Sequence, residues 1–199
     1  VLAALMVGAV FGIQFGNIFR LFGADSLIGA AASFALSKEL APVVGAFLVT
    51  GRAGAAMAAE IATMKVNEQI DALRVMTVNP VSYLVTPRII ASMLMMPLLS
   101  GLFVLCGVLS AFAMSVMLFD VDQGLFFDKI RWITKPRYLV EGLEKAAIFG
   151  VMFSVIACYK GFQASGGARG VGRATTEAVV IALVVGLVSD FFISYAQMK

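Results

Sequence analysis

The sequence contains no histidine, and charged residues are scarce: Asp, Glu, Lys and Arg make up 14% of its 199 residues. An ordinary soluble domain has about 25%. Without histidine the chain lacks the commonest general base and metal ligand of proteins. So few charges cannot cover a soluble globule of this length, and 61% of the residues are hydrophobic. The composition therefore predicts an integral membrane protein, and the modest formal net charge of +3 does not indicate nucleic-acid binding.

Cysteines are also scarce. The two that are present, Cys106 and Cys158, lie in apolar runs and are typical of buried free thiols. Neither a disulfide framework nor a metal-ligand spacing is present, so we expect no metal site and no cofactor in this chain. The sequence opens with VLAALMVG, in the middle of a helical pattern and without signal-peptide features, and we expect a further segment before it.

The glycine-rich stretch GGARGVGR, at 166–173, is superficially similar to a phosphate loop. It lacks the G-K-[ST] ending of that loop and no soluble strand precedes it, which excludes it as an ATP site. Thr175 and Thr176, followed by Glu177, are typical of a helix start, because hydroxyls cap helix N-termini and an acid suits the first turn. We therefore expect the last helix to begin there.

Five apolar segments are long enough to sit in a bilayer, which a helix of about 20 residues can span. Their continuous hydrophobicity, without strand-like alternation, excludes a transmembrane barrel. We predict an all-α integral membrane protein with five transmembrane helices in a single domain over 1–199. The segments are 1–22, 31–59, 89–119 (with Pro97 inside it), 143–162 and 176–195. Basic residues are nearly balanced between the two sides, so the positive-inside rule does not decide the orientation.

Small residues recur at helical spacing in the first two segments. Gly8, Gly12 and Gly16 are four residues apart, and Gly51 and Gly54 begin a similar pattern in the second segment. Such stripes let helices approach closely. They indicate helix packing within the chain or, alternatively, a subunit interface or a mobile seam.

Polar residues within the apolar segments are candidates for function. Gln14, Lys38, Glu39 and Arg52 lie inside or at the edges of the first two segments. Charges at membrane depth are costly and usually face a bundle interior, a water-filled cavity or a partner charge. Lys38 and Glu39 therefore lie either at the headgroup level or in a substrate cavity. Asp190, deep in the last segment, indicates a hydrogen bond to a neighbouring helix or, less readily, a proton relay.

One short charged stretch, EIATMKVNEQIDALRVM at 60–76, interrupts the apolar sequence. At 100° per residue its apolar side chains share one face and its polar ones another, which predicts an amphipathic helix outside the hydrocarbon core. Its pairs Lys65–Glu68 and Asp71–Arg74 have a stabilising i,i+3 spacing. The helix could rest on the bilayer or dock into a groove of another protein. Its mixture of acids and bases and its lack of aromatic residues favour the protein partner.

Two stretches carry a family resemblance. Residues 38–99 read KELAPVVGAFLVTGRAGAAMAAEIATMKVNEQIDALRVMTVNPVSYLVTPRIIASMLMMPLL, and residues 170–180 read GVGRATTEAVV. Both resemble the MlaE/YrbE permeases, the membrane subunits of MCE-associated ABC transporters. The resemblance implies a non-catalytic five-helix permease of the bacterial inner membrane that forms a homodimer around a lipid cavity. The implied substrate is phospholipid, moved between the inner membrane and the outer envelope of a Gram-negative cell.

The resemblance also implies partners. The 60–76 helix would be a cytoplasmic coupling helix that docks on a separate MlaF-like ABC ATPase, which would hold ATP and Mg. A small MlaB-like STAS-domain subunit and a hexameric MlaD-like MCE protein would complete the complex. The MCE protein would lie on the periplasmic side, together with the 120–141 segment. The residues that match the family's coupling block, or lie within it, are Glu60, Lys65, Glu68, Gln69, Asp71 and Arg74.

Residues of a lipid site follow from the same resemblance. Glu39 matches the acid of the family's R-E-L-G-P block, Lys38 stands where Arg is usual, and Ala41 stands where Gly is usual. Gln14 matches the polar residue of a G-x-Q pattern in the first helix. We expect Gln14, Lys38 and Glu39 to meet the headgroup and apolar neighbours to hold the acyl tails; the lipid-binding candidates are Gln14, Leu36, Lys38, Glu39 and Leu40. Two alternatives remain: an ion-coupled secondary transporter, and a scaffold that anchors an MCE assembly.

Overall fold

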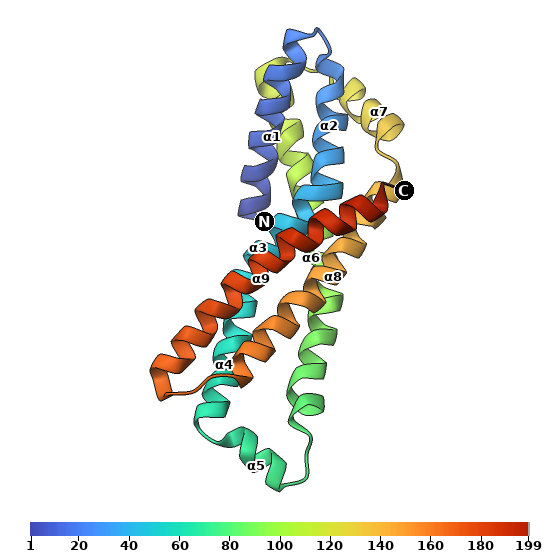
Figure 1. Ribbon diagram of the computed structural model, residues 1–199. Helices are drawn as coiled ribbons and strands as arrows, with labels where there is room; N and C mark the ends of the chain where they lie inside the picture. The colour runs from blue at the N-terminus through green and yellow to red at the C-terminus, as the bar shows by residue number, and fades with distance from the viewer. Residues whose placement is uncertain (199) are drawn as a thin grey trace. The chain divides into compact units, whose positions relative to one another are not determined.

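The computed structural model describes residues 1–198, and these residues form helices and turns without a strand (Figure 1), as the apolar pattern predicts. The first half of the chain forms α1 (Leu2–Leu21), η1 (Asp25–Leu27), α2 (Ile28–Ala35), η2 (Leu36–Leu40), α3 (Ala41–Val49), η3 (Thr50–Gly54), α4 (Ala55–Val66) and α5 (Gln69–Val75). The second half forms η4 (Val81–Val85), α6 (Thr86–Phe119), α7 (Gln123–Ile133), α8 (Pro136–Phe162) and α9 (Gly167–Gln197). The segments η2, η3 and η4 are π-helical, and η1 is a 3₁₀ turn.

Four helical stretches are long and apolar enough to cross a membrane: Leu2–Leu21, Asp25–Val66, Val81–Phe119 and Gly167–Gln197. Four of the five predicted membrane-spanning segments are therefore supported. The remaining predicted crossing lies in α8, which is helical over 27 residues. Its first part carries Arg137, Glu141, Glu144 and Lys145, and these charges set α8 apart from the four apolar stretches.

The chain divides into two compact units, each built from two separate segments. Unit 1 comprises Val1–Pro42 and Leu98–Glu144, and unit 2 comprises Val43–Pro97 and the residues from Lys145 onward. Two prolines inside the helical sequence, Pro42 and Pro97, thus mark chain positions where one unit ends. The single domain expected over 1–199 stays a prediction.

Unit 1 is built on close contact between α1 and α6. A Cβ at Gly8 would collide with the backbone of Gly107, and a Cβ at Gly12 would lie 3.0 Å from the Cα of Ala111. The first glycine stripe therefore packs within the chain, where the missing side chains let two backbones meet. At one end of this contact Ile28, Val121 and Phe126 are buried in a common cluster, joined by Phe15, Phe19, Phe112, Phe119 and Ile130.

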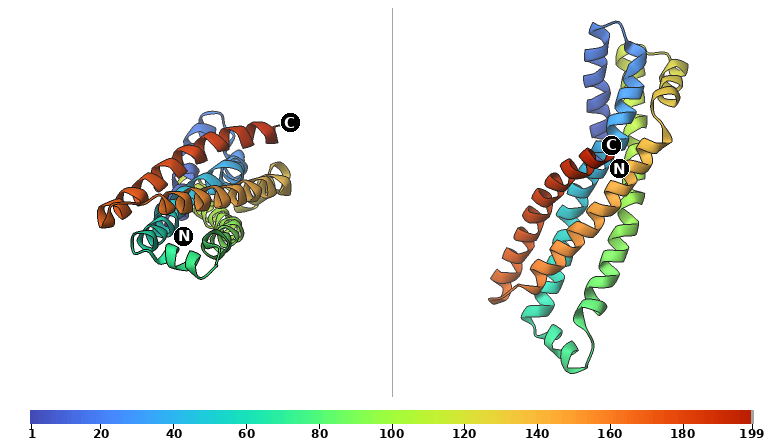
Figure 2. Two further views of the ribbon diagram at one scale, coloured as in Figure 1. Left: turned by 60° about the horizontal axis from the view of Figure 1, so that its bottom comes forward. Right: turned by 45° about the vertical axis from the view of Figure 1, so that its right-hand side comes forward.

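Unit 2 has its own core. Its larger cluster contains Ala46, Met96, Ala146, Phe149, Phe153 and Ala182. Alanines carry the contact of α4 with α9, since Ala58 and Ala178 share one cluster and Ala62 and Ala174 another. Figure 2 shows these helices from two further directions. Small side chains again allow neighbouring helices to approach closely.

One predicted boundary is wrong, and one helix was not predicted. The last helix begins at Gly167 rather than at Thr175 and Thr176, whose hydroxyls donate to the carbonyl oxygens of residues four positions earlier at 2.8 and 2.7 Å. These threonines satisfy their hydroxyls inside a helix instead of capping one. The helix that was not predicted is α7, which Asp122 caps by accepting from the Leu125 amide at 2.9 Å.

Candidate functional site

Lys38 lies in a cluster of polar and aromatic side chains of unit 1. Its side chain is 14% exposed, and its Nζ is 3.5 Å from Oε2 of Glu141 on α8. The ammonium also lies 5.9 Å from the ring centre of Phe34 and 5.7 Å from that of Tyr138, distances at which a cation is attracted by an aromatic face. Glu141 accepts a second bond, of 2.7 Å, from Nε of Arg137. This cluster therefore places two cations around one buried carboxylate.

The π-helical turn η2 explains how adjacent residues reach different surroundings. A π turn widens the helix locally, and such turns are frequent at functional sites. Within it Leu36 is fully buried, whereas Lys38, Glu39 and Leu40 are half-buried. Gln14, on α1, is exposed. Of the predicted lipid-binding residues, Leu36 thus belongs to the core of unit 1, and the other four are at least partly accessible.

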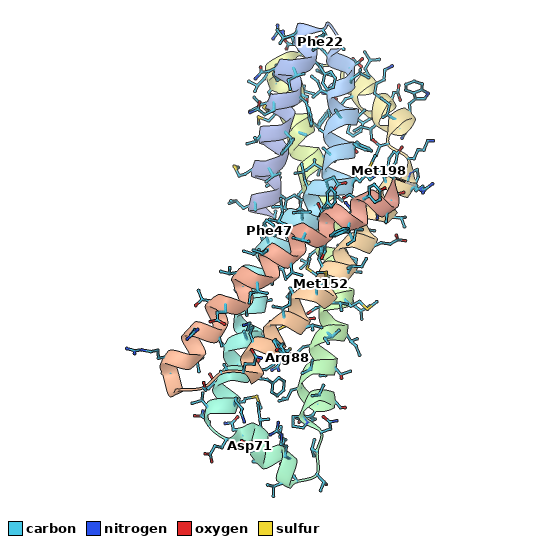
Figure 3. All side chains as sticks on the ribbon, viewed as in Figure 1. Phe22, Phe47, Asp71, Arg88, Met152 and Met198 are labelled. Carbon is cyan, nitrogen blue, oxygen red and sulfur yellow. The ribbon has the colours of Figure 1, made fainter. Side chains whose placement is uncertain are left out.

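An apolar hollow lies among α3, η3, α8 and α9 of unit 2. Phe47 and Met152, two of its lining residues, are labelled in Figure 3. The complete lining is Val43, Ala46, Phe47, Thr50, Phe149, Met152, Phe153, Ala182 and Gly186. These residues could not be predicted, because an apolar side chain in an apolar run gives no signal. The enclosed space is small, about 10 Å³, and its lining is apolar apart from Thr50.

A buried charge cluster joins α8 to α9 in unit 2. Lys145 is fully buried, and its Nζ lies 3.2 Å from Oδ1 of Asp190 and 2.7 Å from Oγ of Ser194. An unpaired buried charge is costly, so the pairing with Asp190 offsets the cost of burying the Lys145 ammonium. The structure thus gives Asp190 a partner on a neighbouring helix, as the first of its two interpretations predicts. The partner itself, Lys145, was not predicted.

The charged stretch at 60–76 is two helices rather than the single amphipathic helix predicted. α4 ends at Val66, and α5 begins at Gln69. Between them Glu68 adopts a left-handed conformation with φ of 59°, which ends the α4 ladder and turns the chain. The predicted pair Lys65–Glu68 is also wrong, because Lys65 pairs across the turn with Asp71 at 3.2 Å.

The remaining contacts fix this α4–α5 turn. Asp71 accepts from Arg74 at 2.9 Å, as predicted. Below these charges Ile70 is fully buried in a cluster with Ile61, Leu84 and Cys158. At the end of α5 and beyond it, five large apolar side chains are exposed: Val75, Met76, Val78, Val81 and Tyr83. The turn therefore presents ion pairs beside uncovered apolar groups.

An ion pair ties the turn to the start of α6. Nη2 of Arg88 lies 2.8 Å from Oε2 of Glu60 on α4, and Nη1 of Arg88 donates to the Leu84 carbonyl at 3.4 Å. Arg88 and Asp71 are labelled in Figure 3. The predicted coupling residue Glu60 is thus linked to α6, whereas Gln69 is exposed at the first position of α5. Arg88 was not among the predicted site residues.

Comparisons with known proteins cover nearly the whole chain. The model of the family described as Permease MlaE matches residues 1–196. A probable ABC transporter permease protein of Synechocystis sp. is 40% identical over 198 residues, which is 100% of this chain and 75% of that protein. One from Rickettsia felis is 40% identical over 187 residues, 94% of this chain and 72% of that protein. The chloroplastic protein TRIGALACTOSYLDIACYLGLYCEROL 1 of Arabidopsis thaliana is 39% identical over 97% of this chain and 55% of its own length.

Proposed function

The chain belongs to the MlaE permease family, and from this membership we propose that it is the membrane subunit of an ABC transporter that moves phospholipids between the inner membrane and the outer envelope. Its relatives and its apolar helices support the coarser statement, a multi-pass membrane permease. The finer statement is supported by two features of the molecule: the α4–α5 turn, and the side chains that a phospholipid meets.

The α4–α5 turn carries the proposal. Ile70 anchors it to unit 2, while Asp71 and Arg74 form an accessible ion pair beside the exposed Val75 and Met76. A surface of this mixed kind suits a groove on a protein better than water or lipid tails. We assign the groove to a separate MlaF-like ABC ATPase that holds ATP and Mg, so that the permease itself carries out no chemistry.

The ion pair between Glu60 and Arg88 connects the surface on which the ATPase docks to the helices α4 and α6. It joins α4 to the beginning of α6 directly beside the turn. A movement of the turn is therefore passed to two long helices at once. This is how ATP binding and hydrolysis in the partner open and close a lipid path in the permease.

Phospholipid is the substrate that fits the polar and apolar surfaces. Lys38 offers a cation to a phosphate group, and its bond to Glu141 is long enough, at 3.5 Å, to be exchanged for one. The partly accessible Glu39 and Gln14 extend this polar surface within unit 1. In unit 2, the small hollow beside Phe47 and Met152 adds an apolar surface that an acyl chain can contact. The family resemblance adds the other partners: a second copy of the chain, an MlaB-like STAS-domain subunit and a hexameric MlaD-like MCE protein.

The test is purification of the chain from its native membrane in mild detergent. We expect an ABC ATPase to co-elute in fixed ratio, and the charge reversal Asp71→Lys with Arg74→Glu to release it. Glu144→Lys, which reverses an exposed acid on α8 outside the turn, is the matched control and should leave the ATPase bound. An ATPase that stays bound to the double variant, or none in the wild-type complex, contradicts the proposal.

The same preparation separates the alternatives. Lipid transport that continues after the charge reversal points to a scaffold for an MCE assembly. If an uncoupler abolishes transport and ATP depletion does not, the protein is an ion-coupled transporter. The second outcome needs a titrating group inside the membrane, and the pairing of Asp190 with Lys145 disfavours Asp190 in that role.

A further inference from the structure

Helix α7 has one face fixed in the core of unit 1. Phe126 is fully buried, and its ring centre lies 5.2 Å from that of Phe112 on α6. A Cβ on Gly29 of α2 would lie 2.8 Å from the Phe126 ring, so α2 and α7 are in close contact. Ile130, one turn after Phe126, packs against the same cluster. The orientation of α7 about its own axis is therefore fixed by packing.

The flank of α7 turned away from the core is apolar and basic. Leu125 and Trp132 are seven residues apart and therefore lie on the same side of the helix. Leu125 is 50% exposed and Trp132 is 78% exposed. Nζ of Lys129 lies 5.5 Å from the centre of the indole ring, and Arg131 is exposed beside it. With Asp128 these residues line a shallow hollow on the surface of unit 1.

The position of α7 in the chain places it near a membrane boundary. Only residues 120–122 separate it from the end of α6, a membrane-spanning candidate whose last turn exposes Met117 and Leu118. α7 also contacts η1, which follows the exposed Leu21 and Phe22 at the end of α1. Large apolar side chains therefore gather where two apolar helices end. Tryptophan and basic residues at such ends are typical of the lipid–water interface.

We propose that α7 lies in the headgroup region of the lipid leaflet reached by the C-terminal end of α6. Trp132 and Leu125 enter the boundary of the acyl chains, to a depth of about 5–10 Å in helices of this kind. Lys129 and Arg131 contact lipid phosphates, and Lys135 adds a further positive charge in the following turn. This charge complementarity, together with the exposed indole, favours lipid over a protein groove. α5 differs in that it mixes acids with bases and has no aromatic residue.

Trp132 is the single tryptophan of the sequence, which gives a direct test. The purified complex is placed in nanodiscs of phosphatidylcholine and phosphatidylglycerol whose acyl chains carry bromine at a shallow or a deep position. The same complex with Trp132→Phe supplies the blank, so that the difference spectrum reports Trp132 alone. We expect blue-shifted emission, stronger quenching by shallow than by deep bromine, and little quenching by iodide in the water.

A second arm tests the basic residues. Lys129→Gln with Arg131→Gln should raise the accessibility of Trp132 to iodide several-fold in discs that contain phosphatidylglycerol, because each basic residue near an anionic surface contributes to binding. Arg169→Gln with Arg173→Gln, two exposed basic residues at the start of α9, is the matched control and should leave the Trp132 signal unchanged. Emission typical of water with full iodide quenching overturns the proposal. So does protection from both iodide and bromine, which means that a protein covers α7.

Discussion

Lys145 is a buried charge that side chains of a neighbouring helix help to compensate. Its ammonium has Asp190 and Ser194 of α9 within 3.2 and 2.7 Å, and no part of its side chain is exposed. Removing one member of such a pair takes away an opposite charge that offsets the cost of burying the other. Removing both with apolar replacements of similar volume leaves no charge behind.

Single and double replacements of this pair should therefore differ sharply. We expect Lys145→Met alone or Asp190→Leu alone to destabilise the protein by about 3–5 kcal/mol. The double variant should recover most of the loss. Thermal unfolding of the detergent-solubilised protein, followed by size-exclusion chromatography, measures this. Equal melting temperatures for the two single variants and the wild type would show that the pair is not buried as described.

Glu68 carries a local conformational cost. Its φ of 59° lies in the left-handed region, which disfavours residues with a Cβ by about 1–2 kcal/mol. We expect Glu68→Gly to stabilise the α4–α5 turn by about 1 kcal/mol. Glu68→Val should be clearly destabilising, because a β-branched side chain is least tolerated at positive φ. Amide hydrogen exchange of α5 reports both effects, and slower exchange in the valine variant than in the glycine variant contradicts the assignment.

At the scale of the elements, α1 and α6 pack closely because their glycines have no side chains to separate the two backbones. A methyl group at Gly8 meets the backbone of Gly107, which cannot move aside as a flexible side chain could. We expect Gly8→Ala to destabilise unit 1 by about 1–3 kcal/mol through overpacking. Gly172→Ala is the control, because a Cβ at Gly172 meets nothing within 4 Å. Thermal unfolding separates the two, and an equal effect of both changes argues against the close contact.

The elements also show what the sequence could predict. Apolar runs and helical spacing were enough for α1, α6 and α9, because burial in lipid requires long uninterrupted helices. Helix α7 was missed, although Asp122 as a cap and the spacing of Phe126 and Ile130 were available as signals. The break at Glu68 was missed because its cause is a backbone conformation and not a side-chain pattern.

Residue partners were the least predictable part. Polar residues in apolar runs, such as Lys38 and Asp190, were identified correctly as exceptional. Their partners Glu141 and Lys145 lie far away in the sequence, and only tertiary packing brings them together. Both partners belong to the charged first part of α8. From composition this part can be identified only as a polar helix end, without its partners. The lining of the hollow was invisible for the opposite reason, since its residues resemble all other apolar residues.

For the whole molecule, the hollow in unit 2 offers a test of lipid passage. Gly186 lines it, and a Cβ there meets no atom within 4 Å, so a new side chain can begin there without a clash. We expect Gly186→Leu to lower lipid co-purification and lipid transport several-fold while the melting temperature stays unchanged. Gly172→Leu, an equally open position on the same helix outside the hollow, should have no effect. Unchanged transport in the filled variant removes the hollow from the lipid path.

The π-helical turn Thr50–Gly54 has a consequence for how this protein tolerates length changes. A π turn contains one residue more than the α-helical turn it replaces. Deleting one residue there converts it into an ordinary turn, so the hydrogen-bond ladder closes and α3 and α4 continue as one helix. Inserting one residue in the regular part of α4 turns every later side chain by about 100° unless a second π turn forms. In most helices a one-residue deletion is as harmful as an insertion. At Thr50–Gly54 the π turn already contains one residue more than an α-helical turn, so a deletion there should be tolerated.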